Sequence, residues 1–547
     1  MTDAQKAMSD KTVLQIKGLC VALAGRGGKQ LLRDVDIEVK AGEITCVVGE
    51  SGSGKSLTAY SVMGLLDPES LRCTAGEILL EDENVLTVTP RRLRELRATR
   101  MSLIFQEPMT ALNPVERIGA QIEEVLEIHC SDDARTRRRR VLEMLEAVHL
   151  PDPQRIFDSY PHQLSGGQRQ RVVICMALIL NPKLLIADEP TTALDVSTQK
   201  QILALIRELQ QKFNTAVLFI THDFGVVVDV ADKVVVMNQG EVVETGSRDE
   251  ILRSPRNDYT RMLVSSVPSL VPQSREAVTG DVVLSIKGLS KIFVRRRILR
   301  PSTVVEAAVD CDLTLHRREI LGIVGQSGSG KSTLARCVIG LETPSAGRIV
   351  LAGEELVNAR GNAFRERFRR IQMVFQDPYR SLNPRVRVGE SIIEGPTNFG
   401  VPRAFAMERA KSLMELVGLP VSALDRFPHQ FSGGQRQRIS IARALIMEPE
   451  VLVADEAVSA LDVSVQARIL KLLESIREKT DVGLLFITHD LRVAAEICDR
   501  VIVMNKGRIV EHGSAEAVLV HPRDAYTRAL IDAAPGRHWD FRNFRPL

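Results

Sequence analysis

The chain has 547 residues, of which 44% are hydrophobic, so it is long enough for several domains with cores of full size. Its 72 basic and 69 acidic side chains leave a formal net charge of only +3, which disfavours a protein built around a nucleic-acid backbone. No run reaches the about 18 apolar residues of a membrane-spanning helix and the start, MTDAQKAMSD, is polar, so we expect a soluble, intracellular chain.

The first element that carries chemistry is a strand followed by a glycine-rich loop. EITCVVG at 43–49 is an apolar, β-like run, and GESGSGKS at 49–56 continues into a helical pattern. In this context the loop's backbone N–H groups and the helix N-terminus bind phosphates, the lysine reaches the β- and γ-phosphates, and the serine ligates Mg²⁺. The predicted residues of the first loop are Gly49, Ser51, Gly52, Gly54, Lys55 and Ser56.

Amphipathic helical patterns follow, between Gln106 and the stretch LSGGQRQR at 164–171. They predict a helical subdomain inserted into the first domain. The basic run RTRRRR at 135–140 starts one of these helices directly after SDDA, so we interpret it as a solvated helix face. A contact of this run with a membrane surface stays open at this point.

Two later strands end in polar side chains, KLLIADE at 183–189 and AVLFITHD at 216–223. Buried parallel strands bring such residues to the carboxyl edge of a sheet. There Asp188 would hold Mg²⁺, Glu189 would polarise an attacking water, and His222 would contact the γ-phosphate and position that water. Solvated carboxylates and a structural histidine are the plain alternatives, and the repetition of all three residues in the second half favours the functional interpretation.

The whole arrangement occurs a second time in the second half of the chain. The halves are separated by the segment 265–281, SSVPSLVPQSREAVTGD. Its two prolines and few large apolar residues predict a linker. The signature, acidic and histidine stretches of the second half lie 267 positions after those of the first. Its predicted site residues are Gly325, Ser327, Gly328, Gly330, Lys331, Ser332, Thr333, Asp455, Glu456 and His489.

Alternating strands and helices of this kind predict an α/β fold. We expect an N-terminal tail at 1–11, a first domain at 12–264, the linker, and a second domain at 282–547. Eight cysteines are scattered without a CxxC pair, which indicates small core residues and not disulfides or a metal site.

A phosphate loop, SGGQ, an Asp-Glu pair and a histidine after the next strand, in this order and twice, resemble the nucleotide-binding domains of ABC ATPases. The resemblance covers nearly the whole chain. It implies an ATPase with two tandem P-loop domains, each with a RecA-like parallel-sheet core, a β subdomain and the helical subdomain. It also implies that the two domains close head to tail on ATP and Mg²⁺, so that each site combines residues of both halves.

The resemblance assigns further residues. The signature residues would cover the ATP of the opposite half: Ser165, Gly166, Gly167 and Gln168 in the first domain, and Ser432, Gly433, Gly434 and Gln435 in the second. Gln106 and Gln376 are similar to the Q-loop residues that touch Mg²⁺ and sense the membrane subunits, and ALD at 193–195 and 460–462 is similar to the D-loop. Phe293 would stack on adenine in the second half, whereas Leu23 stands at that place in the first, which predicts weaker ATP binding there.

Three classes of ABC protein compete. DNA-repair members carry CxxC clusters or long coiled coils, and ribosome-acting tandem proteins have long, charged helical linkers, whereas this linker is short. The stretches FQEPMTALNP, YPHQLSGGQRQR, SPRNDYTRMLVSSVP and HPRDAYTRALIDAAP resemble ATPase subunits of dipeptide and oligopeptide importers, including glutathione and nickel systems. Tyr259 and Tyr526 in the two closing stretches are expected to pack in amphipathic helices.

The importer resemblance implies the protein's partners. It implies two separate transmembrane permease subunits and an extracytoplasmic solute-binding protein, with the chain peripheral on the cytoplasmic face of the inner membrane. We expect no nucleic acid, and no iron–sulfur cluster because no cysteine follows Cys498. The alternative that stays open is a soluble tandem ATPase that acts on ribosomes.

Overall fold

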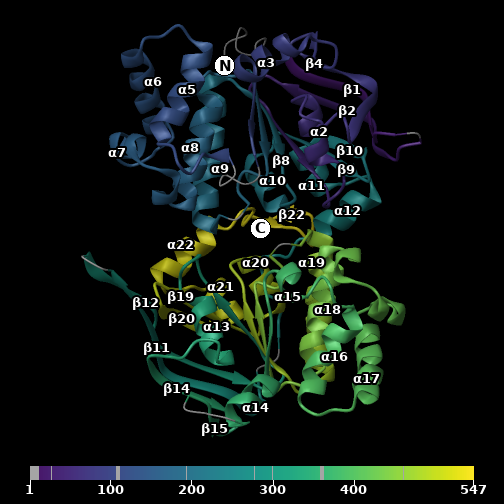
Figure 1. Ribbon diagram of the computed structural model, residues 1–547, viewed down its shortest axis with the longest axis vertical. Coiled ribbons are helices and arrows are strands. Elements are labelled where there is room, and N and C mark those ends of the chain that lie inside the picture. Colours follow the sequence, from purple (N-terminus) through teal and green to yellow (C-terminus); the bar gives the residue numbers. More distant parts are fainter. Residues whose placement is uncertain are drawn as a thin grey trace. The chain divides into compact units, whose positions relative to one another are not determined.

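The computed structural model describes residues 11–25, 27–105, 111–192, 194–275, 278–297, 300–357, 362–459 and 461–547. The chain divides into two compact units, Met1–Ser265 with Asn543–Leu547, and Ser266–Arg542 (Figure 1). Each unit contains two sheets and a group of helices, so the α/β prediction is confirmed for both halves.

The first unit combines an antiparallel and a mostly parallel sheet. The antiparallel sheet has the order β2 (Gln30–Lys40), β1 (Thr12–Leu23), β4 (Leu71–Leu80), β5 (Glu83–Asn84). The second sheet has the order β10 (Glu241–Ser247), β9 (Lys233–Asn238), β3 (Ile44–Val48), β8 (Ala216–Ile220), β7 (Leu184–Asp188), β6 (Met101–Ile104), and only β10 runs antiparallel to its neighbour. The five residues of each of β3, β7 and β8 are all buried, as expected for central strands covered on both faces.

The helices of the first unit are α2 (Lys55–Val62), α3 (Pro90–Thr99), α5 (Ile118–His129), α6 (Ala134–Ala147), α7 (Pro153–Asp158), α8 (Gly166–Leu178), α9 (Val196–Phe213), α10 (Phe224–Val230), α11 (Arg248–Arg253) and α12 (Asp258–Ser265). Figure 1 shows α5, α6, α7 and α8 grouped on one side of the large sheet, with β1, β2 and β4 on the other. The predicted helical subdomain is therefore present.

The second unit repeats this plan. Its antiparallel sheet has the order β12 (Arg300–His316), β11 (Val282–Arg297), β14 (Ala346–Leu351), β15 (Glu354–Glu355). Its large sheet has the order β16 (Ile371–Val374), β17 (Val451–Asp455), β18 (Gly483–Ile487), β13 (Ile320–Val324), β19 (Arg500–Asn505), β20 (Arg508–Ser514). Two short strands, β21 (Trp539–Asp540) and β22 (Arg545–Pro546), lie near the end of the chain.

The helices of the second unit are α13 (Lys331–Ile339), α14 (Asn362–Arg370), α15 (Pro378–Ser381), α16 (Val388–Asn398), α17 (Arg403–Leu416), α18 (Gly433–Leu445), α19 (Val463–Lys479), α20 (Leu491–Ile497), α21 (Ala515–Leu519) and α22 (Ala525–Ala533). Within the described part of the chain, no helix is long and apolar enough to span a membrane.

The basic run at 135–140 lies in α6, as predicted. Asp133 caps this helix by accepting a hydrogen bond from the N–H of Thr136. Arg140 lies 2.5 Å from the carboxylate of Asp132, and the guanidinium of Arg138 lies 4.2 Å from the ring centre of Phe157. These arginines thus have partners within their own unit, which supports the interpretation as a solvated helix face.

The segment predicted as a linker packs against the second unit over much of its length. Val267 and Ser269 are buried, and the guanidinium of Arg275 lies 2.6 Å from the carboxylate of Glu474 in α19. The side chain of Arg275 is only 12% exposed. An ion pair with so little solvent around it is screened weakly, so this contact holds the segment against the unit.

Candidate functional site

Both predicted phosphate loops join a central strand to a helix that starts at the lysine. β3 leads into the first loop and α2 begins at Lys55, while β13 leads into the second loop and α13 begins at Lys331. Gly54 and Gly330 precede the helices with φ angles of 105° and 106°, and a Cβ at either would lie within 2.5 Å of Leu32 or Ala307. Only glycine fits there, because both the backbone angle and the space exclude a side chain.

The lysine of each loop is buried and turned back on its own loop. The Nζ atom of Lys55 donates to the carbonyl oxygens of Gly49 at 2.8 Å and Glu50 at 2.9 Å, and Lys331 does the same with Gly325 and Gln326. Burial lowers the pKa of Lys331. Each amine is thus held within its loop, where it could donate hydrogen bonds to the anionic oxygens of a bound phosphate.

In each unit the serine and the aspartate that are predicted to bind Mg²⁺ contact each other. The Ser56 hydroxyl donates to Oδ1 of Asp188 at 3.1 Å, and Ser332 donates to Oδ1 of Asp455 at the same distance. Burial raises the pKa of both aspartates, against the opposing effect of the serine hydroxyls. The Oδ2 atom of Asp188 is buried and has no hydrogen-bond partner among the described residues. A buried carboxylate oxygen beside a hydroxyl fits the oxygen-ligand preference of Mg²⁺.

The predicted catalytic pair is also formed in each unit. The Nδ1 atom of His222 lies 2.9 Å from Oε1 of Glu189, and the Thr192 hydroxyl donates to Oε2 of the same carboxylate at 3.0 Å. In the second unit the corresponding distance between His489 and Glu456 is 3.3 Å. Ser459 stands at the place of Thr192 in the second half, but its hydroxyl donates to the backbone carbonyl oxygen of Glu456 at 3.0 Å and not to the carboxylate. No pattern in the sequence indicated the contact of Thr192 with Glu189.

The electrostatics of the pair favour an ionised glutamate. Burial alone would raise the pKa of Glu189, but the hydrogen bond and charge of His222 together outweigh it and lower that pKa to about 2. Burial likewise lowers the pKa of His222, yet the carboxylate of Glu189 raises it above its usual value. The hydrogen bond with His489 lowers the pKa of Glu456 in the same way. Each glutamate can therefore accept a hydrogen bond from a water molecule at neutral pH.

Both glutamates also have unusual backbones. The φ angle is 47° at Glu189 and 48° at Glu456, a region that residues other than glycine rarely adopt. Each residue directly follows the last residue of its buried strand, and its N–H donates to the carbonyl at the end of the neighbouring strand, Ile220 or Ile487. Strained backbones of this kind occur at functional sites, where the surrounding structure keeps them in place.

The structure describes Gln376 of the two predicted Q-loop residues. Its side-chain amide donates to Oε2 of Glu456 at 2.7 Å, so in this structure it contacts the glutamate and not Asp455. Its predicted contact with Mg²⁺ stays a prediction. Gln106 and the alanines of the two ALD stretches, Ala193 and Ala460, lie outside the described residues.

The signature residues form helix N-termini. The Ser165 hydroxyl accepts from the N–H of Gln168 at 3.3 Å, and Oε1 of Gln168 accepts from the N–H of Ser165 at 3.0 Å, which is a capping box. Ser432 and Gln435 cap α18 in the same way. The amides of Gly166, Gly167, Gly433 and Gly434 thus belong to the first turns of these helices, where anions bind favourably. Their pairing with the opposite half's ATP stays a prediction.

The predicted adenine position is occupied differently in the two units. Phe293 is 39% exposed in β11, with the Lys291 ammonium 4.8 Å from its ring centre, and Leu23 is 42% exposed at the end of β1. Both side chains are accessible to a base. Only the phenyl ring offers a flat face for stacking, so the predicted difference in ATP affinity stays open to measurement.

Comparison with known proteins agrees with these sites. The family described as ABC transporter matches residues 32–192 and 309–459, and the family described as oligopeptide/dipeptide transporter, C-terminal region, matches residues 243–291. The "Glutathione import ATP-binding protein GsiA" of Salmonella paratyphi A is 42% identical over 562 residues, covering 96% of this chain and 90% of the relative. The "Peptidoglycan transport ATP-binding protein YejF" of Agrobacterium fabrum is 42% identical over 536 residues, covering 97% of each.

These matches extend over both phosphate loops, both acidic pairs and the segment that follows the first domain. The residues that the fold brings together at each loop are of the types that an ATP-hydrolysing site needs: donors for phosphates, a buried carboxylate beside a serine hydroxyl, and an ionised glutamate next to a histidine. The chain belongs to the ABC transporter family, as an ATP-binding ATPase of its oligopeptide/dipeptide branch with two nucleotide-binding domains in one chain.

Proposed function

We propose that this protein couples ATP hydrolysis to the uptake of peptides or peptide-like solutes through separate permease subunits. The observation that carries this proposal is the match of residues 243–291 to the C-terminal region of oligopeptide and dipeptide transporters, next to a complete set of ATPase residues. Its relatives include proteins named for glutathione import and for peptidoglycan transport, which are both peptide-containing molecules. The matches do not support the ribosomal alternative.

In this proposal the protein has two ATP sites, and each half contributes residues to both of them. Ser56 and Asp188 in the first half, and Ser332 and Asp455 in the second, would hold Mg²⁺, which neutralises charge on the β- and γ-phosphates. Glu189 and Glu456 would accept a hydrogen bond from the attacking water, and His222 and His489 would orient that water. The capped N-termini of α8 and α18 would bind the ATP held by the opposite half, so that hydrolysis requires the two domains to close.

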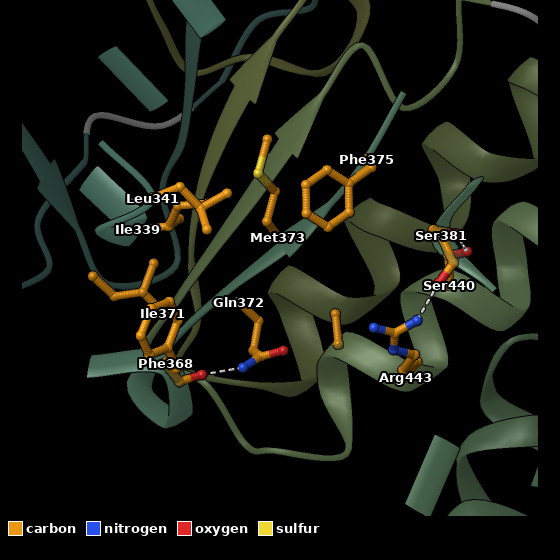
Figure 2. Close-up of a pocket in the computed structure, with 11 residues that line it drawn as sticks. Ile339, Leu341, Phe368, Ile371, Gln372, Met373, Phe375, Ser381, Ser440 and Arg443 are labelled. Carbon is orange, nitrogen blue, oxygen red and sulfur yellow. Dashed lines mark hydrogen bonds between the residues drawn. The ribbon is translucent and has the colours of Figure 1, made fainter. Parts of the chain in front are cut away.

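A hollow in the second unit suits a segment of a permease. It has a volume of about 160 Å³ and lies between β16, the end of α13, and α18. Figure 2 shows apolar side chains, Leu341, Met373 and Phe375 among them, on one side of it, and Ser440 and Arg443 on the other. Leu341 is 53% and Phe375 is 40% exposed, so both present apolar surface to a partner.

The hollow is connected to the catalytic glutamate. Phe375 lines it, and the next residue, Gln376, donates to the carboxylate of Glu456. A permease segment that moves Phe375 would therefore move the side chain that touches the catalytic glutamate. We infer that a short loop or helix of the permease docks there, with the chain peripheral on the cytoplasmic face of the inner membrane and a solute-binding protein on the far side.

Gentle extraction of the tagged chain from its native membranes, without ATP, tests this function. Mass spectrometry should identify two polytopic membrane proteins in fixed proportion to the chain. Phe375→Asp should abolish their recovery, whereas Val520→Asp, which alters a similarly exposed apolar side chain outside the hollow, should leave it intact. Recovery of ribosomal proteins from the soluble fraction instead of permeases would overturn the proposal.

A further inference from the structure

Two tyrosines outside the predicted sites contact the phosphate loops. The hydroxyl of Tyr259, in the first turn of α12, accepts a hydrogen bond from the backbone N–H of Glu50 at 3.3 Å. The hydroxyl of Tyr526, in the first turn of α22, accepts one from the N–H of Gln326 at 3.1 Å. Glu50 and Gln326 each follow the first glycine of their loop, so the contact falls on the same loop position in both units.

The backbone around Tyr259 is held in place by its own contacts. The carboxylate of Glu244, in β10, accepts hydrogen bonds from the N–H groups of Arg256 at 2.7 Å and Asn257 at 3.2 Å. The side-chain oxygen of Asn257 accepts in turn from the N–H of Tyr259 at 2.8 Å. A glutamate on a sheet strand thus fixes the turn before α12, and this turn aims the tyrosine at the loop.

The second unit repeats this arrangement contact for contact. Glu511, in β20, accepts from the N–H groups of Arg523 at 2.7 Å and Asp524 at 3.2 Å, and Asp524 accepts from the N–H of Tyr526 at 2.8 Å. Each of these residues lies 267 positions after its counterpart. The glutamate, the arginine and the tyrosine are the same in both halves, whereas the side-chain acceptor is Asn257 in the first and Asp524 in the second.

In each loop the tyrosine and the lysine form hydrogen bonds with the same residue, the tyrosine with its backbone N–H and the lysine with its carbonyl oxygen. Lys55 donates to the carbonyl oxygen of Glu50, whose N–H is bonded to Tyr259, and Lys331 does the same at Gln326. In a P-loop the lysine reaches the β- and γ-phosphates, so a bound nucleotide competes with that carbonyl for the hydrogen bonds of the amine. The tyrosine contacts the amide at the start of the loop, so its hydrogen bond can persist when the lysine turns to the nucleotide.

We propose that Tyr259 and Tyr526 are positioning residues that hold the start of each phosphate loop in its binding shape, independently of the lysine. Tyr259 lies in the segment that matches the oligopeptide/dipeptide transporter C-terminal region, so this segment is attached directly to the ATP site of its own domain. The proposal rests on ATP binding at these loops. The proposal goes beyond the expectation that these tyrosines only pack in their helices. Tyr526 does pack in this way, because its side chain contacts the core of the second unit.

The test uses the full-length chain with Tyr259→Phe and Tyr526→Phe, singly and together, since phenylalanine keeps the ring and removes only the hydroxyl. A loop that is less preorganised weakens binding of ATP and of the transition state alike, which raises KM and leaves kcat unchanged. We expect the double variant to raise the KM for ATP about three- to tenfold, the range for loss of one ordinary hydrogen bond per site. The kcat should stay within about twofold of the parent value.

Amide hydrogen exchange in the nucleotide-free protein measures directly whether the tyrosine hydroxyls protect the backbone N–H groups of Glu50 and Gln326. Exchange at Gln326 should accelerate in Tyr526→Phe and exchange at Glu50 in Tyr259→Phe, with the larger effect at Gln326 because its hydrogen bond is shorter. The matched controls are Thr260→Val and Thr527→Val. These hydroxyls belong to the adjacent residues of the same helices, and within the described chain they are buried and without a hydrogen-bond partner. The control variants should leave KM and both exchange rates at parent values.

The outcomes separate this inference from the proposed function. Unchanged exchange at both amides in the tyrosine variants would overturn it, and so would equal effects of the threonine and tyrosine variants, because a general loosening of the helix would then be the cause. If the parent chain did not hydrolyse ATP, the proposed function would fail, while the exchange rates would still decide whether the tyrosines hold the loops.

Discussion

The Nδ1 atom of His222 lies 2.9 Å from Oε1 of Glu189, a residue whose backbone has a φ angle of 47°. The carboxylate is thereby held by a side chain from the next strand of the sheet, at a backbone position that only a well-packed surrounding can maintain. Because β18 and β17 deliver His489 and Glu456 in the same way, both halves have an ionised glutamate next to the aspartate that is predicted to bind Mg²⁺. This pair leads to the first two predictions.

Replacement of both glutamates, Glu189→Gln and Glu456→Gln, should trap ATP and lower steady-state hydrolysis by at least about a hundredfold, as expected for loss of a general base. Glutamine keeps the shape of the side chain but cannot take up a proton from the water. Filter binding of labelled ATP and a phosphate-release assay measure the two effects. Glu241→Gln, in an exposed ion pair with Arg33, is the control. Undiminished hydrolysis in the double variant would refute the assigned role.

The charge of Glu189 should also be visible in the titration of His222. The carboxylate raises the pKa of His222 above its ordinary value of 6.5, so Glu189→Gln should lower that pKa. Because the folded-state pKa of His222 is raised and that of Glu189 is lowered to about 2, the pair stabilises the fold fully between pH 4.5 and 6.5. This stabilisation is lost as the pH rises through the raised pKa of His222, or falls through the lowered pKa of Glu189. Proton NMR of the histidine ring measures the shift. A His222 pKa that stays the same in Glu189→Gln would contradict the pairing.

Removal of the carboxylate that is proposed to bind Mg²⁺ should weaken Mg²⁺ binding more than ATP binding. Asp188→Asn keeps a hydrogen-bond acceptor for Ser56 but removes the charge, so the Mg²⁺ concentration for half-maximal hydrolysis should rise at least about tenfold. Asp455→Asn should have the same effect at the second site. Paramagnetic resonance of bound Mn²⁺ gives an independent measure. Equal Mn²⁺ affinity in parent and variant would exclude the aspartate as a ligand.

The two signature glycines of each half should differ in their effect on stability. A Cβ at Gly167 would lie 2.4 Å from Cγ2 of Thr198, whereas a Cβ at Gly166 would meet its nearest atom, in Leu194, at 3.8 Å. Gly167→Ala should therefore destabilise the first domain by about 1–3 kcal/mol, the usual cost of overpacking, and Gly166→Ala should have little effect on stability. Calorimetric thermal unfolding of both variants measures this. Equal unfolding temperatures of the two variants would show that α8 and α9 leave room for a Cβ at Gly167.

The cysteines should fall into two groups in their reaction with thiol reagents. Cys46, Cys175 and Cys498 are fully buried, and burial raises the pKa of each thiol, so they should stay unmodified in the native protein. Cys20 and Cys130 are only half-buried and should react first. Peptide mapping after brief alkylation, with a sample in denaturant as the control, distinguishes the groups. Early modification of Cys46 would show that the first unit opens locally at β3.

The sequence by itself determined the parts of each site that one continuous segment forms. The phosphate loop at 49–56 and the acidic pair at 188–189 were predicted because their chemistry depends on successive residues of one loop or strand end. The SGGQ stretch at 165–168 was assigned by its resemblance to the ABC ATPase signature. The repeat then showed that two such sites exist, and the alternation of strands and helices predicted the α/β fold.

The tertiary structure alone decided which residues that are distant in the sequence contact each other. Tyr259 reaches Glu50 across 209 positions of the chain, and Gln376 reaches Glu456 across 80. Arg275 of the predicted linker reaches Glu474 across 199. Hydrophobic periodicity predicts which face of a helix or strand is buried. Which side chains of other elements contact that face depends on how the sheets and helices pack together. The contact between a helix after the last strand and the loop after the third therefore arises from packing, which no local pattern records.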